Sequence, residues 1–246
     1  LECLSGMPFE VEFISFDDVK NGIPEDIKVI INVGDAYTAF SGAENWIDEA
    51  VVTNIRRFVD QGGGFIGVGE PTAYQHQGRF FQLSDVLGVD REMCFSLNTD
   101  KYNELDANHF ILEDIDGEVD FGEGTSRVYA QGKNYQVLAM DGEYSQLVVN
   151  EYGKGHSVYF AGLPYSPQNC RILLRAIYYA AGMENEMKRY YVTNVDTEVT
   201  VFQKSKKIAV INNSSEAQYT EVYINGNCVY KLDMEPGEMR WVDDVE

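Results

Sequence analysis

The apolar positions divide the chain into alternating strand-like and helix-like segments up to about residue 182. Residues 27–34 form a nearly continuous apolar run, which is typical of a strand buried on both faces of a sheet. Residues 46–61 carry apolar side chains at helical spacing, and residues 65–68 form a second apolar run. This order predicts a strand–helix–strand unit with two parallel strands.

Residues 9–16 largely alternate between apolar and polar, so we predict a strand near the start of the chain. A helix is expected over residues 167–181, with Ser166 as its N-cap. Further short strands, separated by glycine-containing turns, are expected at residues 127–130, 135–140, 146–152 and 156–161. Together these elements predict a layered α/β sheet with helices on both faces.

The pattern changes after residue 182. Residues 184–189 are mostly charged and read as a linker. Residues 190–246 contain short alternating runs, and Asn225-Gly226 is a strong hairpin signal. We therefore predict an α/β domain over residues 1–183, a linker over 184–189, and a small all-β sandwich over 190–246.

Charge excludes two classes of partner. Aspartate and glutamate outnumber lysine and arginine by 40 to 19, which gives a formal net charge of −21. Such a chain repels phosphate backbones and anionic lipids, so we expect no nucleic-acid and no membrane partner.

The four cysteines are far apart in the sequence and include no CxxC pair. We expect free, buried thiols in a reducing compartment, and hence a cytoplasmic protein. The chain begins with Leu1, shows no signal-peptide pattern, and leads at once into core-like sequence. We therefore expect it to be a piece of a longer protein.

Ligands of parallel α/β sheets bind beyond the carboxyl ends of the strands. The strongest candidate there is Glu70, which stands between Gly69 and Pro71 directly after the second strand. A sharp turn at a strand end can present one side chain in this way. Asp35 follows the first strand, and Arg79 is a polar group that could line a cleft, although nothing in the local sequence decides this. The alternative for Glu70 is a carboxylate that caps the next helix.

No histidine pair has metal-ligand spacing, so we expect no metal site. The acidic residues 113–120 do not match a calcium-binding loop, because the glycine stands at the wrong position. We expect a solvated acidic loop instead.

Residues 62–73 and 78–90 resemble the middle domain of the 1,3-β-galactosyl-N-acetylhexosamine phosphorylases. This family is also called lacto-N-biose or galacto-N-biose phosphorylase and includes the galactosyl-rhamnose phosphorylases. Residues 153–182 are similar as well, and the terminal β region matches the family's C-terminal domain by order and character. Gly69-Glu70-Pro71 is the most specific part of the resemblance.

The family's middle domain is similar to the class I glutamine amidotransferases, which have a flavodoxin-like sheet. An amidotransferase needs a cysteine at the sharp turn that follows the strand, called the elbow, and a histidine–glutamate pair later in the sequence. Here the elbow carries Glu70, and His156 is not followed by a glutamate two residues on. The resemblance therefore implies the fold without glutaminase activity.

The resemblance implies reversible, inverting phosphorolysis of β-galactosides to α-galactose 1-phosphate and a free acceptor sugar. Inorganic phosphate would be a co-substrate, and no cofactor is expected. The family's general acid, an aspartate, and its phosphate-binding groups lie on an N-terminal (β/α) barrel that this chain lacks. Glu70 would contribute hydrogen bonds to galactose hydroxyls, with Asp35 and Arg79 as further substrate-binding candidates. The chain alone is expected to be inactive.

The acceptor sugar stays open between N-acetylglucosamine, N-acetylgalactosamine and rhamnose, and we expect a homodimer. Two other hypotheses compete with that of a galactoside phosphorylase fragment. The chain could be a non-catalytic amidotransferase-like module for subunit contact or scaffolding, or a stand-alone carbohydrate-binding protein.

Overall fold

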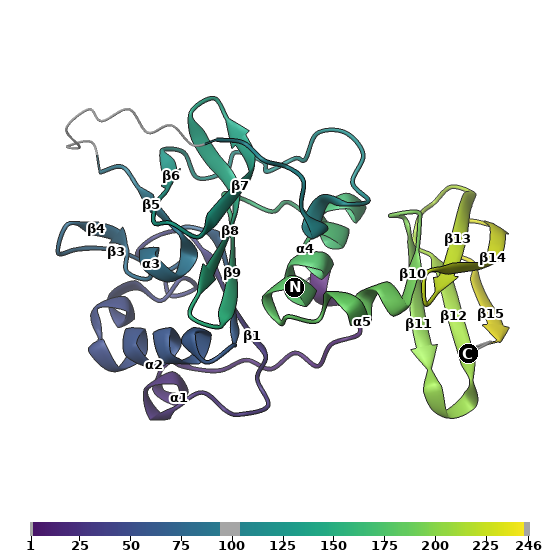
Figure 1. Cartoon of the computed structure of the whole chain (residues 1–246), viewed down its shortest axis with the longest axis horizontal. Helices are drawn as coiled ribbons and strands as arrows, with labels where there is room; N and C mark the ends of the chain where they lie inside the picture. Colours follow the sequence, from purple (N-terminus) through teal and green to yellow (C-terminus); the bar gives the residue numbers. More distant parts are fainter. Residues whose placement is uncertain (1, 94–103, 244–246) are drawn as a thin grey trace.

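A five-stranded mixed sheet forms the centre of the larger part of the chain (Figure 1). The computed structural model describes residues 2–93 and 104–243. The first three strands in spatial order are parallel to one another, the fourth is antiparallel to the third, and the fifth is antiparallel to the fourth. In that order the strands are β1 (Val29–Gly34), β2 (Gly64–Gly69), β9 (Gly155–Phe160), β8 (Tyr144–Tyr152) and β7 (Tyr135–Asp141). The predicted parallel strand–helix–strand unit is confirmed.

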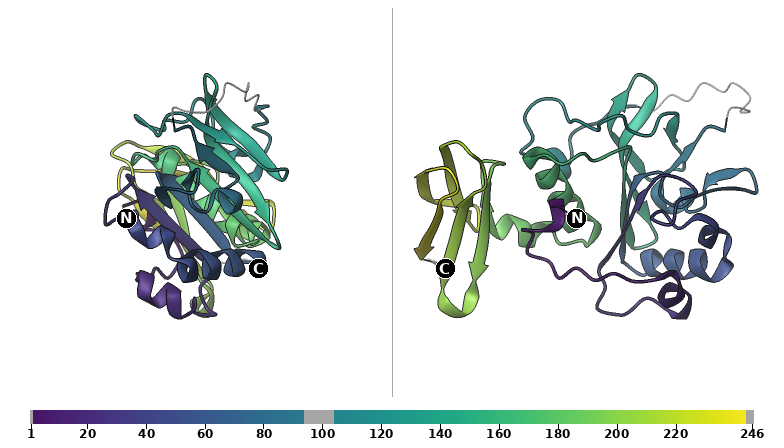
Figure 2. Two further views of the ribbon diagram at one scale, coloured as in Figure 1. Left: turned by 90° about the vertical axis from the view of Figure 1, so that its left-hand side faces the viewer. Right: turned by 180° about the vertical axis from the view of Figure 1, so that it is seen from behind.

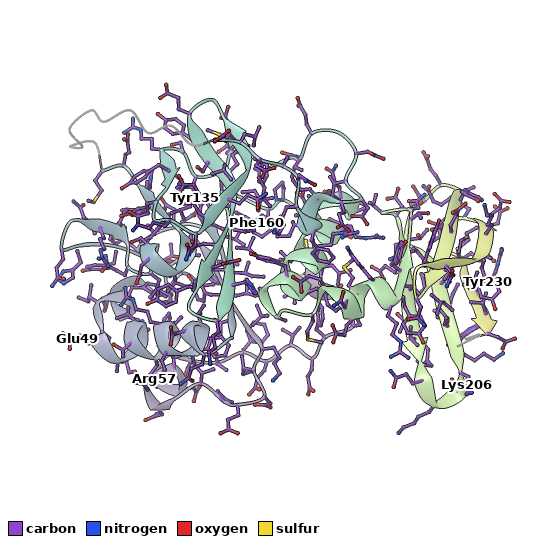
Figure 3. All side chains as sticks on the ribbon, in the orientation of Figure 1. Glu49, Arg57, Tyr135, Phe160, Lys206 and Tyr230 are labelled. Atoms are coloured by element: carbon purple, nitrogen blue, oxygen red, sulfur yellow. The ribbon has the colours of Figure 1, made fainter. Side chains whose placement is uncertain are left out.

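Helices cover both faces of this sheet, as expected from the sequence. Successive residues of a strand point to opposite faces, so Phe65 and Ile66 of β2 enter two separate cores. The core around Phe65 includes residues of α2 (Glu49–Asp60), and the core around Ile66 includes residues of α4 (Pro167–Ala180). Glu49 and Arg57 lie on the outer side of α2 (Figure 3).

Both long helices begin at side-chain caps. The Ser166 hydroxyl accepts a hydrogen bond from the Asn169 N–H at 3.0 Å, which confirms the predicted N-cap of α4. The helix predicted from residue 46 begins later, at Glu49. Asp48 caps it by accepting from the Ala50 N–H at 2.9 Å, and a 3₁₀ turn (Ala43–Ile47) precedes it.

The prediction of a strand over residues 9–16 is wrong. Residues 9–15 form neither helix nor strand, and the helix α1 (Phe16–Asn21) follows them. Ser15 and Asp18 form a reciprocal capping box, which fixes the start of α1. Residues 10–14 make no backbone–backbone hydrogen bond to any described residue, so the alternating pattern alone does not produce a strand.

Several small elements connect β2 to the antiparallel part of the sheet. The strand predicted at residues 127–130 forms over Val128–Ala130, but it pairs outside the main sheet. The elements are a hairpin of β3 (Ala73–His76) and β4 (Arg79–Phe81), the short helix α3 (Ser84–Leu87), and the pair β5 (Val89–Arg91) with β6 (Val128–Ala130).

The C-terminal part is a small all-β sandwich, as predicted (Figures 1 and 2). Asn225 and Gly226 both have positive φ, 50° and 78°, which fits the tight hairpin turn expected there. One sheet contains β10 (Tyr190–Val192), β13 (Gln218–Ile224) and β14 (Asn227–Met234). The other contains β11 (Thr197–Phe202), β12 (Lys207–Asn212) and β15 (Met239–Asp243). Apolar residues from both sheets share one core.

The segment expected as a linker forms the helix α5 (Glu184–Arg189). Its acidic residues lie in the first turn and its basic residues in the last, which complements the helix dipole. Met187 is buried, so this segment also contributes to packing. The division into domains 1–183 and 190–246 stays a prediction.

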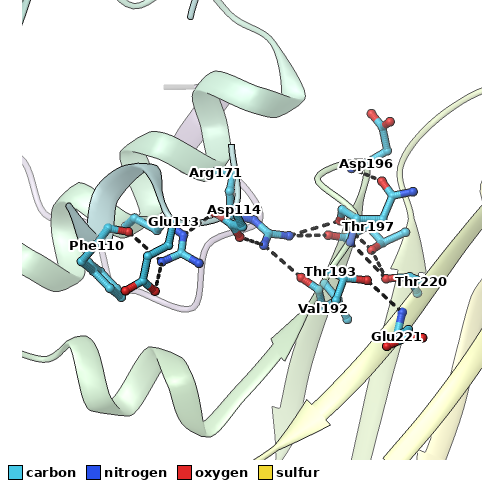
Figure 4. A network of polar contacts seen from close by, with 12 residues as sticks. Phe110, Glu113, Asp114, Arg171, Val192, Thr193, Asp196, Thr197, Thr220 and Glu221 are labelled. Carbon is cyan, nitrogen blue, oxygen red and sulfur yellow. Dashed lines mark hydrogen bonds and ion pairs between the residues drawn. The ribbon is translucent and has the colours of Figure 1, made fainter. Parts of the chain in front are cut away.

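A buried arginine joins the two parts of the chain (Figure 4). Arg171 of α4 donates to an Asp114 carboxylate oxygen at 2.7 Å. It also donates to the carbonyls of Val192, Asn194 and Thr197, at 3.0, 3.2 and 3.4 Å. The expectation that residues 113–120 are simply solvated is therefore wrong for Asp114. A partner 57 residues away, outside the local sequence pattern, neutralises its charge.

Cys3, Cys170 and Cys228 are free thiols, as predicted, but none of the three is buried: Cys3 and Cys170 are partly exposed and Cys228 is exposed. Cys94 lies outside the described residues. None of the helices in residues 2–93 and 104–243 combines the length and apolar character that a membrane-spanning helix needs.

Candidate functional site

Glu70 lies directly after β2, at the carboxyl end of the parallel strands. Gly69 has φ of 78°, a conformation that favours glycine. A Cβ at Gly67 would lie 2.5 Å from Cγ of Pro71, so this glycine leaves room for the proline ring. The Glu70 N–H donates to the Gly34 carbonyl at 3.0 Å, which extends the β1–β2 pairing. These local constraints present the Glu70 side chain at the end of the strand.

A buried tyrosine supports this turn from the neighbouring strand. The hydroxyl of Tyr159, on β9, donates to the Gly69 carbonyl at 3.1 Å. Burial raises the pKa of Tyr159 well above its usual value, so the phenol stays protonated and acts as a donor. The backbone before Glu70 is thereby fixed on both sides.

The Glu70 carboxylate is held through both of its oxygens. Oε2 accepts a hydrogen bond from the Ala36 N–H at 2.7 Å, and Oε1 forms an ion pair with Nη1 of Arg91. The side chains of Glu70 and Arg91 are 16% and 29% exposed. The Arg91 guanidinium also lies 5.0 Å from the centre of the Phe80 ring, in a cation–π contact. Each carboxylate oxygen keeps a lone pair with which it can bind a ligand.

Asp35 lies in the loop that supplies the Ala36 N–H, so the structure brings this loop and Glu70 together. The Asp35 side chain is exposed. Its carbonyl accepts from the hydroxyls of Ser41 and Thr38, at 2.6 and 2.7 Å, which gives the loop a fixed turn. Two predicted carboxylate positions therefore share one edge of the sheet.

The chain reverses sharply after Glu70. Thr72 is fully buried and has φ of 57°, which is uncommon for a residue other than glycine. Its N–H donates to Oδ1 of Asn32 at 3.2 Å, and its carbonyl accepts from the Gln82 N–H at 2.9 Å. Strained backbone of this kind is concentrated at functional sites, which supports the choice of this turn.

The alternative role of Glu70, as the cap of a following helix, does not fit this geometry. The chain enters the hairpin β3–β4 after Glu70, and the helix α3 begins only at Ser84. The carboxylate contacts a loop amide and an arginine instead.

The structure places Arg79 away from Glu70. Arg79 is exposed on β4 and lines a polar groove of about 570 Å³ together with Asp90. Asp90 and Arg91 are neighbours on β5, so their side chains point to opposite sides of that strand. Arg91 contacts Glu70 on one side, and Asp90 faces the groove with Arg79 on the other.

Asp90 is a buried carboxylate in this groove wall, 4% exposed. Its Oδ1 accepts from the N–H groups of Arg91, Phe81 and Phe80, at 2.8, 2.9 and 3.2 Å. Burial nevertheless raises the pKa of Asp90 above its ordinary value. The carboxylate thus fixes the path of the chain between β4 and β5.

Arg91 was not among the sequence candidates, although it contacts Glu70 most directly. It stands 21 residues after Glu70 and immediately after the segment that resembles the phosphorylases. The available signal was its position: Arg79 and Arg91 are the two arginines between residues 71 and 93. Which of the two arginines reaches Glu70 depends on the side of β5 that each one faces, and a linear sequence does not show this.

The amidotransferase arrangement is absent from the described residues. Glu70 occupies the position after the strand, whereas His156 lies at the start of the parallel strand β9. A strand advances about 3.3 Å per residue, so His156 lies at the opposite end of the sheet from Glu70. His156 packs against Tyr179, with ring centres 4.8 Å apart.

Sequence comparison identifies two family domains in the chain. The lacto-N-biose phosphorylase central domain matches residues 1–186, and the C-terminal domain of the same family matches residues 190–242.

Curated relatives support this match over the whole chain. A 1,3-β-galactosyl-N-acetylhexosamine phosphorylase of Lachnoclostridium phytofermentans is 49% identical over 248 residues, covering 100% of this chain and 34% of the relative. The enzyme of that name from Bifidobacterium longum is 38% identical, with 98% of this chain and 37% of the relative covered. A D-galactosyl-β-1→4-L-rhamnose phosphorylase of L. phytofermentans is 33% identical, with 94% and 31% covered. The chain therefore spans about a third of the length of these relatives.

Solved structures share the fold at much lower identity. A β-galactosidase from Rahnella sp. R3 matches with a TM-score of 0.51 and 16% identity, over 97% of this chain and 35% of that protein. The β-galactosidase Gan42B, of glycoside hydrolase family 42, matches with a TM-score of 0.50 and 14% identity, over 98% and 34%. These structures support the fold alone. The domain matches and the relatives together show that the chain belongs to the lacto-N-biose phosphorylase family, of which it comprises the central and C-terminal domains.

Proposed function

We propose that this chain is part of a glycoside phosphorylase that reversibly converts β-galactosides and phosphate into α-galactose 1-phosphate and a free acceptor sugar. Substrates of the galacto-N-biose and lacto-N-biose type are supported by the names of the relatives. The catalytic acid and the phosphate site belong to an N-terminal (β/α) barrel of the full-length protein. This chain supplies one wall of the galactose pocket and supports the barrel.

The observation that carries this proposal is the Glu70 carboxylate, held between the Ala36 N–H and Arg91 at the end of β2. A half-buried charge without a partner would be costly, and Arg91 neutralises it. The pair leaves acceptor lone pairs on Glu70 and donor N–H groups on Arg91. A neutral sugar presents hydroxyls that both donate and accept, so it matches such a pair. The exposed Asp35 side chain, in the loop that supplies the Ala36 N–H, adds a second carboxylate on the solvent side of the site.

Phosphorolysis needs only one protein general acid, because phosphate itself is the nucleophile. The contribution of this chain is therefore binding and orientation of the galactosyl group. Its interactions accelerate the chemical step to the extent that they bind the galactosyl group more tightly in the transition state than in the bound substrate.

The test is an assay of the purified full-length protein with phosphate and three disaccharides: lacto-N-biose, galacto-N-biose and galactosyl-rhamnose. We expect α-galactose 1-phosphate from at least one of them, and the preferred disaccharide identifies the acceptor sugar. Release of free galactose without sugar phosphate would contradict the proposal, because it would show a hydrolase.

The second candidate is a non-catalytic amidotransferase-like module that serves subunit contact or scaffolding. It is favoured by the similar fold in β-galactosidases, whose names state a different reaction. In that case changes at Glu70 would leave the kinetics intact. We also propose a cytoplasmic homodimer, which is tested by cell fractionation and by light scattering of the full-length protein.

A further inference from the structure

The outer edge of β1 is an open sheet edge of unusual composition. β1 is the terminal strand of the five-stranded sheet, and its sequence, Val-Ile-Ile-Asn-Val-Gly, is largely apolar. Exposed edge strands normally carry charges, prolines or bulges that prevent further pairing. β1 contains none of these, and its pairing with β2 is regular over all six residues.

The direction of the backbone groups follows from two hydrogen bonds. The carbonyls of Lys28 and Gly34 accept from the neighbouring N–H groups of Gly64 and Glu70. Alternate residues of a strand direct their N–H and C=O groups to the same edge, so Ile30 and Asn32 also face β2. The N–H and C=O groups of Val29, Ile31 and Val33 therefore point outward. None of these six groups has a hydrogen-bond partner within residues 2–93 and 104–243.

A second unpaired segment lies near this edge. Residues 9–15 run without helix or strand toward α1 (Figures 1 and 2). Phe9 packs into the same core as Val29 and Ile31, whereas Ile14 packs into the core that contains Ile30. The segment thus passes from one face of the sheet to the other beside β1. Its residues 10–14 make no backbone–backbone hydrogen bond to any described residue.

Exposed apolar side chains concentrate in the same region. Six of the thirteen exposed large hydrophobic residues in the described part of the chain fall before residue 48. Val33 on β1 is 48% exposed and Phe13 is 80% exposed. Phe40 is 87% exposed, and its Cβ lies close to Gly34, the last residue of β1. Apolar surface of this kind marks a contact site.

We propose that, in the full-length protein, a β-strand from the part that precedes residue 1 pairs with the outer edge of β1 as a sixth strand. Its other edge is then available to residues 10–14, whose alternating pattern suits a strand. The added strand satisfies the outward backbone groups and covers the exposed apolar side chains.

The identity of this occupant rests on the family match. The chain corresponds to a central and a C-terminal domain, and it spans about a third of its relatives. The remaining length therefore includes residues before the central domain. A second copy of the chain is the competing occupant, and it would give a crosslinked product of dimer mass rather than monomer mass.

Amide hydrogen exchange at single-residue resolution in the full-length protein tests the pairing. After correction for intrinsic rates, we expect the outward amides of Val29, Ile31 and Val33 to exchange within about tenfold of the inward amides of Ile30 and Asn32. The inward amides are the internal control, because they bond to β2 in either case. Outward amides that exchange about 100-fold faster or more would overturn the proposal.

A proline at Val33 gives a second measurement. The Val33 side chain is half exposed, so Val33→Ala removes little packing and keeps the N–H. Val33→Pro also removes the outward N–H, a loss that an edge strand tolerates where this N–H faces solvent but that costs a hydrogen bond where a strand is paired. In the full-length protein we expect Val33→Pro to lower Tm by about 5 °C or more relative to Val33→Ala. Equal Tm values for the two variants would refute the pairing.

A photo-crosslinking side chain identifies the occupant. With p-benzoylphenylalanine in place of Val33, we expect a link to a peptide that precedes residue 1, in a product of monomer mass. A product of dimer mass linked through residues 29–34 of another copy would overturn the assignment.

Discussion

Glu70→Gln in the full-length protein is the most informative single change. The amide oxygen of glutamine can still accept from the Ala36 N–H, so the contact that is 2.7 Å long in the structure is preserved. The side that faces Arg91 loses its charge, and an NH₂ group turned toward the guanidinium would place donor against donor. The substitution therefore removes one charge-assisted interaction while it preserves the shape of the side chain.

The magnitude follows from that difference. A hydrogen bond to a charged group contributes about 1.5–3 kcal/mol, and 1.36 kcal/mol corresponds to a factor of ten in rate. We expect kcat/KM to fall by roughly 10–100-fold for the β-galactoside and for galactose 1-phosphate, since both carry the galactosyl group. The KM for phosphate should change little. Because the ion pair is partly exposed, its loss should cost only about 1 kcal/mol of stability, or roughly 2–4 °C in Tm.

The assay combines two-substrate kinetics in both directions with a thermal midpoint. The matched control is Glu221→Gln. Glu221 is also a carboxylate with a cationic partner, Lys231 at 2.9 Å, but it lies on β13 of the C-terminal sandwich. The control should leave kcat/KM unchanged. If Glu70→Gln lowers Tm but leaves kcat/KM at the wild-type value, Glu70 is a structural residue and the proposed galactose contact is refuted.

Three further predictions follow from the structure. The isolated 246-residue chain should release no sugar phosphate from any galactoside, and measurable turnover would show that the general acid lies within it. Arg171→Met in the full-length protein should cost about 1.5–3 kcal/mol, the size of a hydrogen bond to a charged group, because Asp114 keeps a second buried partner in Arg175. Calorimetry should show a lower Tm, and proteolysis near residues 190–197 should increase. An unchanged Tm would contradict the role of Arg171. Burial raises the pKa of Asp90 in the folded protein above its unfolded value near 3.8. The contribution of the Asp90 carboxyl to stability is therefore fully present below the unfolded pKa, and it is lost as pH rises through the folded pKa. The Tm of Asp90→Asn minus that of the wild type should therefore be larger at pH 7 than at pH 4, and an equal difference at both would count against this assignment.

Local signals in the sequence predict much of the fold. The apolar runs of β1 and β2, the glycine turn before β9 and the Ser166 cap of α4 each depend on neighbouring residues, and all were predicted. Residues 9–16 show the limit of this reasoning. Their alternation is that of a strand, but a strand needs a partner, and no described residue provides one.

The same distinction applies to the candidate site. The position of Glu70 follows from the adjacent Gly69 and Pro71, so sequence reasoning finds it. Arg91 was missed and Arg79 was favoured, because the side of β5 that each one faces depends on tertiary structure. The pairing of Asp114 with Arg171 was missed for a similar reason, since the two residues are 57 positions apart.

The contacts of Arg171 have a consequence for the evolution of the C-terminal sandwich. On the sandwich, this guanidinium binds the main-chain carbonyls of Val192, Asn194 and Thr197. Every amino acid supplies a carbonyl, so the contacts with Arg171 depend on the backbone path at these positions and not on which side chains they carry. A substitution of Arg171 itself removes the guanidinium and therefore these bonds. Saturation mutagenesis of this junction should therefore separate two kinds of constraint. Arg171 is constrained by its own contacts with the sandwich, whereas Val192 and Asn194 are constrained by core packing and by hydrogen bonds of the Asn194 amide to Gln218 and Tyr219.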